Sequence, residues 1–575
     1  MNEGIRMEHV GGVAVGAATG ARGLSRREEA RATAPAFPLL LLPIVVVGLL
    51  VRLAAADRLP PHVDEGNMVL GIHTVAARGW PLLPSGVLYI HGATISYLLA
   101  PLAWLGWADY TNLFPLRVAS AIFGAVAIYL TYRLARTVLG SSPAALLAAV
   151  FVALDPLNVL WGGFIRMYSL LEVLALLIAW LFVRIVARDD GEALPDRPQA
   201  WLLAGLVVTF WLAVFTQAVA SLLWPVMAVT ALLLFGRSLL GAWRSLTLAL
   251  GLCLLAPLAF LAASTFVGYG STTDRTAGKN RTGFLGDDAL DLSHLLHPSL
   301  RGLSDLYAHG PIAGFVPILI VLVCGLVLGR YLLTTTRDDD RVDRRAIGFL
   351  LLLFWTPILL FAFFVAEQKS RYLLDILPIG YILVAAAVMA LISYRDSHGP
   401  VGRPSWLARL GAVGLVLLLF GHFAGGLWTL NAWGIEQTEA GLPLALNYVV
   451  AHRAAGELTV VGSTPEAYLV LGNQEPVQAY GGVLARPGSG RGSPKIDDWV
   501  GWPVVQSTRD LCAVLTAHPG TWFVLGNQRL DPGVATTTFL LGATKEVLQT
   551  PDGFHVFRST PSSSWDPAVA AQCGK

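Results

Sequence analysis

Long apolar runs are the feature that most constrains the fold of this chain. Stretches of roughly 20 apolar residues follow one another between residues 37 and 430. As an α-helix, each stretch covers about 30 Å, the thickness of the hydrocarbon core of a bilayer. Only 14% of the 575 residues are charged and the mean hydropathy is +0.61, whereas soluble domains carry roughly 25% charged residues. The sequence therefore predicts a polytopic α-helical membrane protein.

We predict about eleven membrane-spanning helices from these runs. The arginines between them fall on alternate loops, on the same side as the arginine-rich N-terminus. The positive-inside rule places that side in the cytoplasm. The predicted spans lie near residues 37–55, 115–134, 143–161, 169–187, 200–218, 219–236, 245–266, 311–332, 346–366, 371–393 and 409–430.

This orientation places two long loops, 57–114 and 267–310, and the C-terminal region on the outer face of the membrane. Long loops on one face and tight turns on the other indicate that the chemistry takes place on the long-loop face. Within the first outer loop, residues 65–78 and 89–107 are helical in pattern. Treating the second stretch as a span would put the arginine loops outside, so we interpret both as helices at the membrane interface.

The C-terminal region changes character and predicts a small α/β domain with a partly parallel sheet. Segments with the pattern of strands alternate there with segments that have the pattern of helices. Cys512 and Cys573 lie in this region and are able to form a disulfide if it is extracytoplasmic, although the sequence does not give their separation. The strand-like segments are 457–462, 521–525 and 554–557, and the helical ones are 443–453, 465–471 and 508–517. The predicted domains are a cytoplasmic tail (1–36), a transmembrane domain (37–430) and an extracytoplasmic α/β domain (431–575).

Asp64 and Glu65 are adjacent carboxylates just outside the first span. Charge near a bilayer is costly and is usually retained for a function. One carboxylate of such a pair can act as a general base, and the other can orient a substrate or help to hold a divalent cation. The structural alternative for Asp64 is a helix N-cap, a position that aspartate favours. For Glu65 the sequence leaves open whether it positions the acceptor, tunes Asp64 or faces solvent.

Several segments together resemble the GT-C superfamily of membrane glycosyltransferases, most closely the family 39 type, which includes protein O-mannosyltransferases and aminoarabinose transferases. The resemblance is carried by Asp64-Glu65, by Leu88–Leu99, by Phe114–Val138 and by Arg166-Met167-Tyr168-Ser169. It weakens after about residue 200, where Gln368-Lys369-Ser370-Arg371-Tyr372 is the main remaining match. The resemblance implies a GT-C fold in the plasma (inner) membrane of a cell.

The resemblance also implies a reaction. A sugar would pass from a polyprenyl-phosphate donor to an acceptor hydroxyl at the outer interface, with inversion at the anomeric carbon. Asp64 is then the candidate general base, because a hydroxyl is a poor nucleophile until a carboxylate accepts its proton. The departing phosphate needs cationic stabilisation. We expect no cofactor, and a divalent cation at Asp64-Glu65 stays open.

The residues that the resemblance assigns to the donor phosphate are mostly basic or aromatic. His91 stands where relatives often have lysine, and it carries full charge only below about pH 6.5. Arg117 is a weaker candidate of the same kind. Glu172, one turn below Tyr168, is the expected partner of Arg166. The alternative to phosphate binding, for these basic residues, is a position at the membrane interface in contact with lipid headgroups. The predicted phosphate ligands are His91, Arg166, Tyr168, Lys369, Arg371 and Tyr372.

Three other functions compete with this interpretation. A transporter or lipid-sugar flippase would carry buried charges at mid-membrane and broken helices in paired halves, and neither is clear in the sequence. A non-catalytic protein that binds sugar lipids is the second alternative. An oligosaccharyltransferase or ligase, which transfers a preformed glycan, is the third. The sequence names neither the sugar nor the acceptor.

Overall fold

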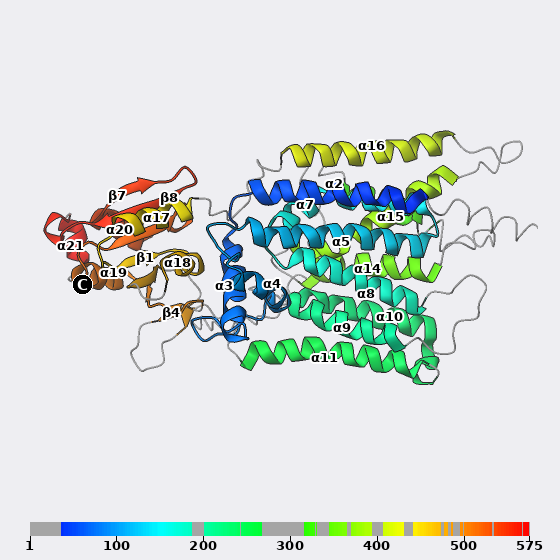
Figure 1. The fold of residues 1–575 in the computed structure, drawn as a ribbon, viewed down its shortest axis with the longest axis horizontal. Coiled ribbons are helices and arrows are strands. Elements are labelled where there is room, and N and C mark those ends of the chain that lie inside the picture. The colour runs from blue at the N-terminus through cyan, green and yellow to red at the C-terminus, as the bar shows by residue number, and fades with distance from the viewer. Residues whose placement is uncertain are drawn as a thin grey trace, which may run out of the picture.

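The computed structural model consists of a helical bundle and a sheet-containing C-terminal region, with two short helices between them (Figure 1). All structural statements below concern the residues that the structure describes. These are 36–186, 200–241, 243–266, 316–327, 329, 344–364, 370–393, 406–429, 441–472, 476–480, 485–486, 495–497, 499–531, 534–565 and 567–573. The first 35 residues and the predicted outer loop at 267–310 therefore lie outside the described residues.

Within these described ranges, eight helices are long and apolar enough to cross a membrane, or nine if the bent pair α6–α7 forms one span. Helices α9 and α13 occupy the two other predicted spans and are shorter. The protein is an integral membrane protein, as predicted. The bundle contains α2 (Ala36–Arg58), α5 (Phe114–Leu139), α6 (Ser142–Leu154), α7 (Pro156–Gly163), α8 (Tyr168–Val186), α9 (Ala200–Thr216), α10 (Leu223–Phe235), α11 (Arg244–Phe266), α13 (Val316–Val327), α14 (Arg344–Phe364), α15 (Leu377–Ser393) and α16 (Trp406–Trp428).

The helices of the bundle differ in how much of their surface they bury. Helices α8 and α15 are the most buried spans, whereas α2, α11 and α16 are the least buried. Figure 1 shows α16 and α11 at opposite edges of the bundle. Their exposed leucines fit a lipid-facing surface, because a helix that is apolar on every side needs no water-facing stripe. The short 3-10 helices are η1 (Ala218–Leu222), η2 (Gly236–Leu240), η5 (Ser370–Ile376), η7 (Asn527–Arg529) and η8 (Ser562–Ser564).

The span predicted at 143–161 is broken rather than straight. Helices α6 and α7 meet at an angle of 55°. Pro156 has no N–H to donate and occupies the first turn of α7. The Asp155 side chain accepts a hydrogen bond from the Asn158 N–H (2.7 Å) and so caps α7. The sequence Asp-Pro therefore ends one helix and starts the next inside the bundle.

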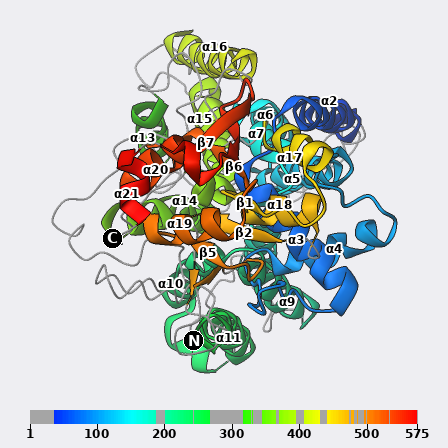
Figure 2. The ribbon, with the colours of Figure 1, turned by 90° about the vertical axis from the view of Figure 1, so that its left-hand side faces the viewer.

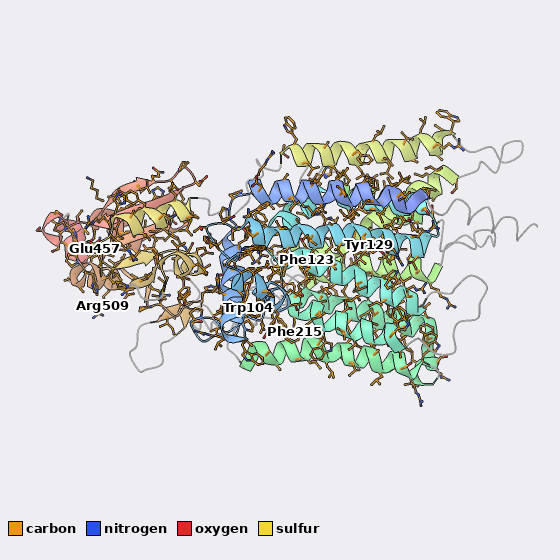
Figure 3. The ribbon with its side chains drawn as sticks, in the orientation of Figure 1. Trp104, Phe123, Tyr129, Phe215, Glu457 and Arg509 are labelled. Atoms are coloured by element: carbon orange, nitrogen blue, oxygen red, sulfur yellow. A yellow bond between two sulfur atoms is a disulfide. The ribbon has the colours of Figure 1, made fainter. Side chains whose placement is uncertain are left out.

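Two short helices of the loop at 57–114, which the sequence predicts to be outside the membrane, lie between the bundle and the C-terminal region. They are α3 (Val63–Arg78) and α4 (Ala93–Trp104). Gly79 ends α3 in a left-handed conformation (φ 74°), which glycine adopts without the strain that a Cβ would cause. The Trp104 indole donates to the Ala76 carbonyl (2.9 Å), which ties α4 to α3 (Figure 3).

The C-terminal region contains a six-stranded sheet in the order β5-β2-β1-β6-β8-β7. Strands β5, β2, β1 and β6 are parallel, because helices α18 and α19 form crossover connections, and β8 and β7 are antiparallel. A disulfide joins Cys512 to Cys573, so the open question about this pair is answered.

The predicted α/β character of this region is confirmed, and Figure 2 shows the sheet and its helices in front of the bundle, from the end at which they lie in Figure 1. The strands are β1 (Thr459–Val461), β2 (Val477–Tyr480), β3 (Ala485–Arg486), β4 (Ile496–Asp497), β5 (Val504–Val505), β6 (Trp522–Gly526), β7 (Thr544–Gln549) and β8 (Phe554–Ser559). The helices are α17 (Leu442–His452), α18 (Thr464–Leu471), α19 (Thr508–Ala517), α20 (Ala535–Ala543) and α21 (Pro567–Cys573).

Candidate active site

The start of α3 positions both predicted carboxylates. His62 is the N-cap, and its Nδ1 accepts a hydrogen bond from the Asp64 N–H (3.1 Å). The Glu65 side chain accepts from the His62 N–H (2.9 Å), which completes a capping box. The alternative in which Asp64 caps the helix is therefore wrong, and its carboxylate is available for other contacts.

His62 caps the helix in its neutral form. It is buried against the rings of Trp161 and Phe164, with centroid distances of 5.7 and 5.4 Å. This burial lowers the pKa of His62 to about 4, although the nearby Asp64 carboxylate opposes the change. A neutral imidazole keeps Nδ1 as an acceptor at physiological pH, which the cap requires.

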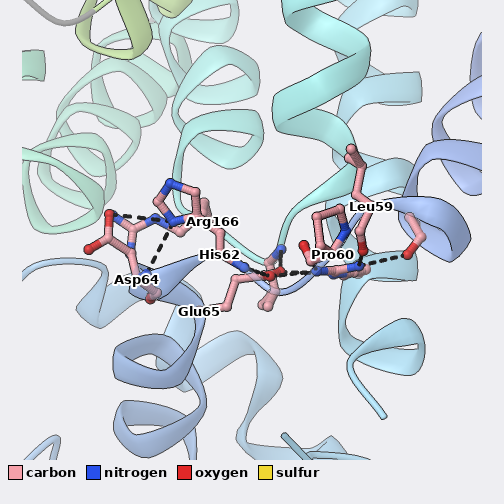
Figure 4. Close-up of polar contacts among 9 residues, drawn as sticks. Leu59, Pro60, His62, Asp64, Glu65 and Arg166 are labelled. Carbon is pink, nitrogen blue, oxygen red and sulfur yellow. Dashed lines mark hydrogen bonds and ion pairs between the residues drawn. The ribbon is translucent and has the colours of Figure 1, made fainter. Parts of the chain in front are cut away.

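Asp64 lies between two arginines from distant parts of the chain. Its Oδ2 lies 3.0 Å from Arg166 Nη2 and 3.9 Å from Arg371 Nη1. Arg166 Nη1 also donates to the Asp64 carbonyl (2.9 Å), so this guanidinium holds both the backbone and the side chain of Asp64 (Figure 4). The Asp64 side chain remains 23% exposed. The structure therefore brings together three predicted site residues around one partly open carboxylate.

Aromatic rings surround the two arginines. Arg166 lies over the ring of Tyr168 (5.6 Å), and Arg371 lies over the rings of Trp161 (5.7 Å) and Tyr372 (5.6 Å). Tyr168 contacts Trp161 and Tyr372 edge-on or tilted, at 4.9 and 6.4 Å. Cations over aromatic faces are stabilised by the ring quadrupole. Tyr168 and Tyr372 were predicted as site residues, whereas Trp161 was missed because it lies in an apolar run.

Arg166 stays charged although it is buried. Burial lowers the pKa of its guanidinium, but the Asp64 carboxylate together with the Tyr168 and Tyr89 side chains outweighs this effect, and the net pKa is raised. An arginine held in this way is a fixed positive charge in the loop between α7 and α8, beside the start of α3.

Glu65 does not face solvent. Its carboxylate is fully buried and accepts hydrogen bonds from Arg117 Nε (2.9 Å) and Nη2 (2.6 Å) and from the Ile165 N–H (2.8 Å). It therefore connects α3 to α5 and to the loop that carries Arg166. The geometry fits a positioning role for Glu65, and its catalytic role stays a prediction.

Arg117 is oriented toward the protein interior. Besides Glu65, its guanidinium donates to the carbonyls of Ala56 (2.9 Å), Leu59 (2.6 Å) and Pro60 (3.0 Å). These contacts occupy both terminal nitrogens and Nε. The prediction that Arg117 contacts the donor phosphate does not fit this placement.

The remaining predicted phosphate ligands are less well placed. His91 Nδ1 lies 3.2 Å from the Gln217 side-chain oxygen, and its ring contacts Phe260 at 5.6 Å. These contacts place His91 against the start of η1 and against α11, so its role at the phosphate stays a prediction. Lys369 lies outside the described residues.

Comparisons with known proteins show what this chain is similar to. Residues 92–260 match the dolichyl-phosphate-mannose-protein mannosyltransferase family. The structure is similar to ArnT from Cupriavidus metallidurans bound to undecaprenyl phosphate, with 14% identity, a TM-score of 0.58 and coverage of 91% of this chain and 99% of ArnT. It is also similar to the oligosaccharyltransferase of Archaeoglobus fulgidus in complex with Zn and sulfate, with 14% identity, a TM-score of 0.53 and coverage of 90% of this chain and 73% of that one. No curated protein gives a significant match to the whole chain.

The chain has the GT-C fold. The resemblance found in the sequence is thus confirmed: the family match spans residues 92–260, and the similarity of fold extends over nearly the whole chain. Helices α3 and α4 directly follow α2 along the chain. The cluster around Asp64 therefore lies in the loop that the sequence predicts to be outside the membrane.

No group of three or more His, Cys, Asp or Glu side chains that could hold a metal ion occurs in the described part of this GT-C protein. The buried Glu65 carboxylate accepts hydrogen bonds from Arg117 and from two backbone N–H groups. Asp64 is therefore the one carboxylate of the adjacent pair that is partly exposed. That the protein uses no cofactor stays a prediction.

The structure also shows a group of buried charges within the spans, of which only Glu172 was predicted from the sequence. Arg52, Asp155 and Glu172 are buried in the bundle, next to the break between α6 and α7. Glu172 interacts electrostatically with Arg52 rather than with Arg166, which corrects the predicted pairing. One broken span and buried charges are features of transporters, but the ends of the broken helices are closed by side chains of the protein itself.

Proposed function

We propose that this protein is a glycosyltransferase that moves a sugar from a polyprenyl-phosphate donor to an acceptor hydroxyl on the outer face of the membrane. One observation carries the proposal: the partly exposed Asp64 carboxylate is joined to the guanidinium groups of both Arg166 and Arg371. This arrangement combines a base with two cations beside the ends of membrane spans. The GT-C fold and the mannosyltransferase family match support the class of reaction.

The proposed step is an inverting displacement. The acceptor oxygen attacks the anomeric carbon, the bond between that carbon and the phosphate oxygen breaks, and the acceptor proton passes to Asp64. The leaving lipid phosphate keeps the electron pair of the broken bond. Arg371 and Arg166 stabilise its charge, and the aromatic rings around them limit access of water to the pair.

The two arginines have different partners before and after the donor binds. Without donor, both face Asp64, which holds it as a carboxylate. A phosphate at the same guanidinium groups competes for their N–H donors and reduces their hold on Asp64. In this proposal the donor therefore makes Asp64 a better base at the moment when a base is needed.

The lipid tail and the orientation follow the same logic. ArnT from Cupriavidus metallidurans was solved with undecaprenyl phosphate, and we extend a polyprenyl-phosphate carrier to this chain as a proposal. The exposed apolar faces of the outer helices provide a route for such a tail from the bilayer. We propose the plasma (inner) membrane, with the N-terminus in the cytoplasm and the C-terminal region outside, on the basis of the arginine loops.

The transporter alternative has one specific observation in its favour, the broken span α6–α7. In transporters, half-helix ends at mid-membrane leave backbone groups for the substrate. Here Arg52 and Asp155 occupy both ends of the break. We therefore prefer the transferase and treat transport as an outcome of the test.

The test is a transfer assay on purified protein with short-chain polyprenyl-phosphate sugars and with membrane and cell-wall extracts as acceptors, read by mass spectrometry. Asp64→Asn should lower turnover by roughly 10²–10⁴-fold, because it removes the base but keeps the size of the side chain. Asp57→Asn is the matched control, since Asp57 is exposed at the end of α2. Turnover by Asp64→Asn at the wild-type rate would refute the assignment, and donor movement across vesicles without transfer would favour a flippase.

A further inference from the structure

The position of α2 relative to α7 determines how Asp64 meets Arg166. The chain leaves α2 at Arg58 and reaches Asp64 in the first turn of the next helix. It leaves α7 at Gly163 and reaches Arg166 in the following short loop. The two helices pack against each other. A small slide of one helix along the other would therefore change the distance between the two charged groups.

Arg52 of α2 bonds to the end of the helix that precedes α7. Its side chain is fully buried in the bundle. Nη2 donates to the Val152 carbonyl (2.9 Å), and Nη1 donates to the carbonyls of Ala153 (3.1 Å) and Gly48 (3.0 Å). The last carbonyls of any helix lack partners within the helix. Arg52 supplies these partners to α6 at the break, where no water of the bulk phase is present.

Glycines on the neighbouring helices make room for the Arg52 side chain. A Cβ at Gly162 of α7 would lie 2.9 Å from Arg52 Cδ, and one at Gly124 of α5 would collide with Arg52 Nε. A Cβ at Gly163 would lie 3.0 Å from the Ala55 Cβ of α2. The stem of Arg52 is thus held between α5 and α7, and α7 lies directly on α2.

Both ends of α7 are fixed. At its start, Asp155 accepts hydrogen bonds from the Asn158 N–H (2.7 Å) and from the Tyr381 hydroxyl (2.6 Å) of α15. Beyond its end, the Ile165 N–H donates to the Glu65 carboxylate (2.8 Å). A displacement at the broken end would therefore be transmitted along two turns of helix to the loop beside α3.

We propose that Arg52 is a positioning residue for the transfer reaction: by joining α2 to the broken span, it sets the geometry between Asp64 and Arg166. The inference rests on the proposed function. Arg371 lies over the ring of Trp161 in α7, but its backbone belongs to η5 and Arg52 does not bond to it, so it should still attract the donor phosphate. Loss of Arg52 should therefore reduce turnover more than it reduces donor binding.

The first experiment measures kcat and the donor KM for wild type, Arg52→Met and Arg52→Lys, using only the folded, monodisperse fraction of each preparation. Arg52→Met should lower kcat by roughly 10–100-fold, because a misplacement of about 1 Å at a reacting group has an effect of this order. The donor KM should change by less than about threefold. Arg52→Lys should recover part of kcat, since an ammonium group can still donate to one of the carbonyls.

A second pair of variants guards against a simple loss of folding. Gly162→Ala should lower kcat by pushing α7 away from the Arg52 stem, whereas Gly251→Ala should have no effect, because nothing lies within 4 Å of a Cβ at Gly251. In an Arg52→Ala background, Gly162→Ala should change kcat by less than about twofold, since the clash is gone.

The results separate the inference from the proposed function. If wild type transfers no sugar from any donor, the proposed function fails. If wild type is active and Arg52→Met keeps its kcat, the positioning role is refuted. Additive effects of Gly162→Ala and Arg52→Ala would equally overturn it, because independent sites do not share a contact. A parallel loss of kcat and donor affinity would assign Arg52 to general folding rather than to positioning.

Discussion

Glu65→Gln is expected to destabilise this protein strongly, although it changes the size of the side chain very little. The Glu65 carboxylate is fully buried and accepts four hydrogen bonds. Two come from Arg117, and the other two come from the backbone N–H groups of His62 and Ile165. Glutamine has one acceptor oxygen, and its NH₂ group would face N–H donors. The substitution therefore leaves the buried Arg117 guanidinium without a counter-charge.

The size of the effect follows from this loss of charge. Removing one member of a buried ion pair typically costs about 3–5 kcal/mol. Since glutamine keeps one acceptor, we expect the free energy of unfolding to fall by about 3 kcal/mol. Each 1.4 kcal/mol is a factor of ten, so the folded-to-unfolded ratio should fall by roughly 100-fold. Activity per folded molecule should also fall, because Glu65 holds the loop that carries Arg166.

The assay is unfolding of purified protein in mixed micelles with increasing sodium dodecyl sulfate, followed by tryptophan fluorescence. The double variant Glu65→Gln/Arg117→Met should be more stable than Glu65→Gln, because it no longer contains an uncompensated buried charge. Asp57→Asn serves as the control for a carboxylate at the surface. If Glu65→Gln unfolds at the same detergent fraction as wild type, the ion pair contributes no stability and the reasoning is wrong.

Two further predictions concern the same helix. The pKa of His62 is about 4 in the folded protein, against an ordinary value of 6.5. Between these pH values the unfolded chain binds a proton at His62 that the folded chain does not bind. The free energy of unfolding should therefore fall by up to roughly 3 kcal/mol as the pH drops from about 6.5 to 4. His62→Asn keeps a capping side chain and should remove most of this pH dependence of the unfolding midpoint; an unchanged slope would contradict it. Gly66→Ala should lower the melting temperature, because its Cβ would collide with the Glu466 carboxylate of α18, and Glu466→Ala should restore it. A Gly66→Ala variant that melts like wild type would show that α18 does not press on α3.

The elements of the fold were largely predictable because their signals are local. Apolar runs of about 20 residues indicate spans whatever their neighbours are, and Gly79-Trp80 marks the end of α3 in the sequence. Arg166 and Arg371 could be assigned to the site only through the family resemblance. Their approach to Asp64 joins segments more than 100 residues apart, which no local pattern shows.

The features that the sequence did not predict depend on tertiary contacts or on a local signal hidden within a long apolar run. Asp155-Pro156 is a helix-start signal within an apolar run, and it was passed over because the run had the length of one span. Arg52 is a charge inside the first span, which is itself a signal of function, yet its partners are backbone carbonyls that carry no sequence signature. The pairing of Glu65 with Arg117 was equally hidden, because the two residues are 52 positions apart and no local pattern joins them.

The adjacent carboxylates have separate tasks for a geometrical reason. Successive residues of an α-helix point about 100° apart, so Asp64 and Glu65 cannot face the same group. Glu65 turns toward the bundle and binds the buried Arg117, whereas Asp64 turns toward Arg166 and Arg371 and keeps an exposed edge. A two-carboxylate motif at the start of this helix therefore gives one buried anchor and one carboxylate that stays accessible.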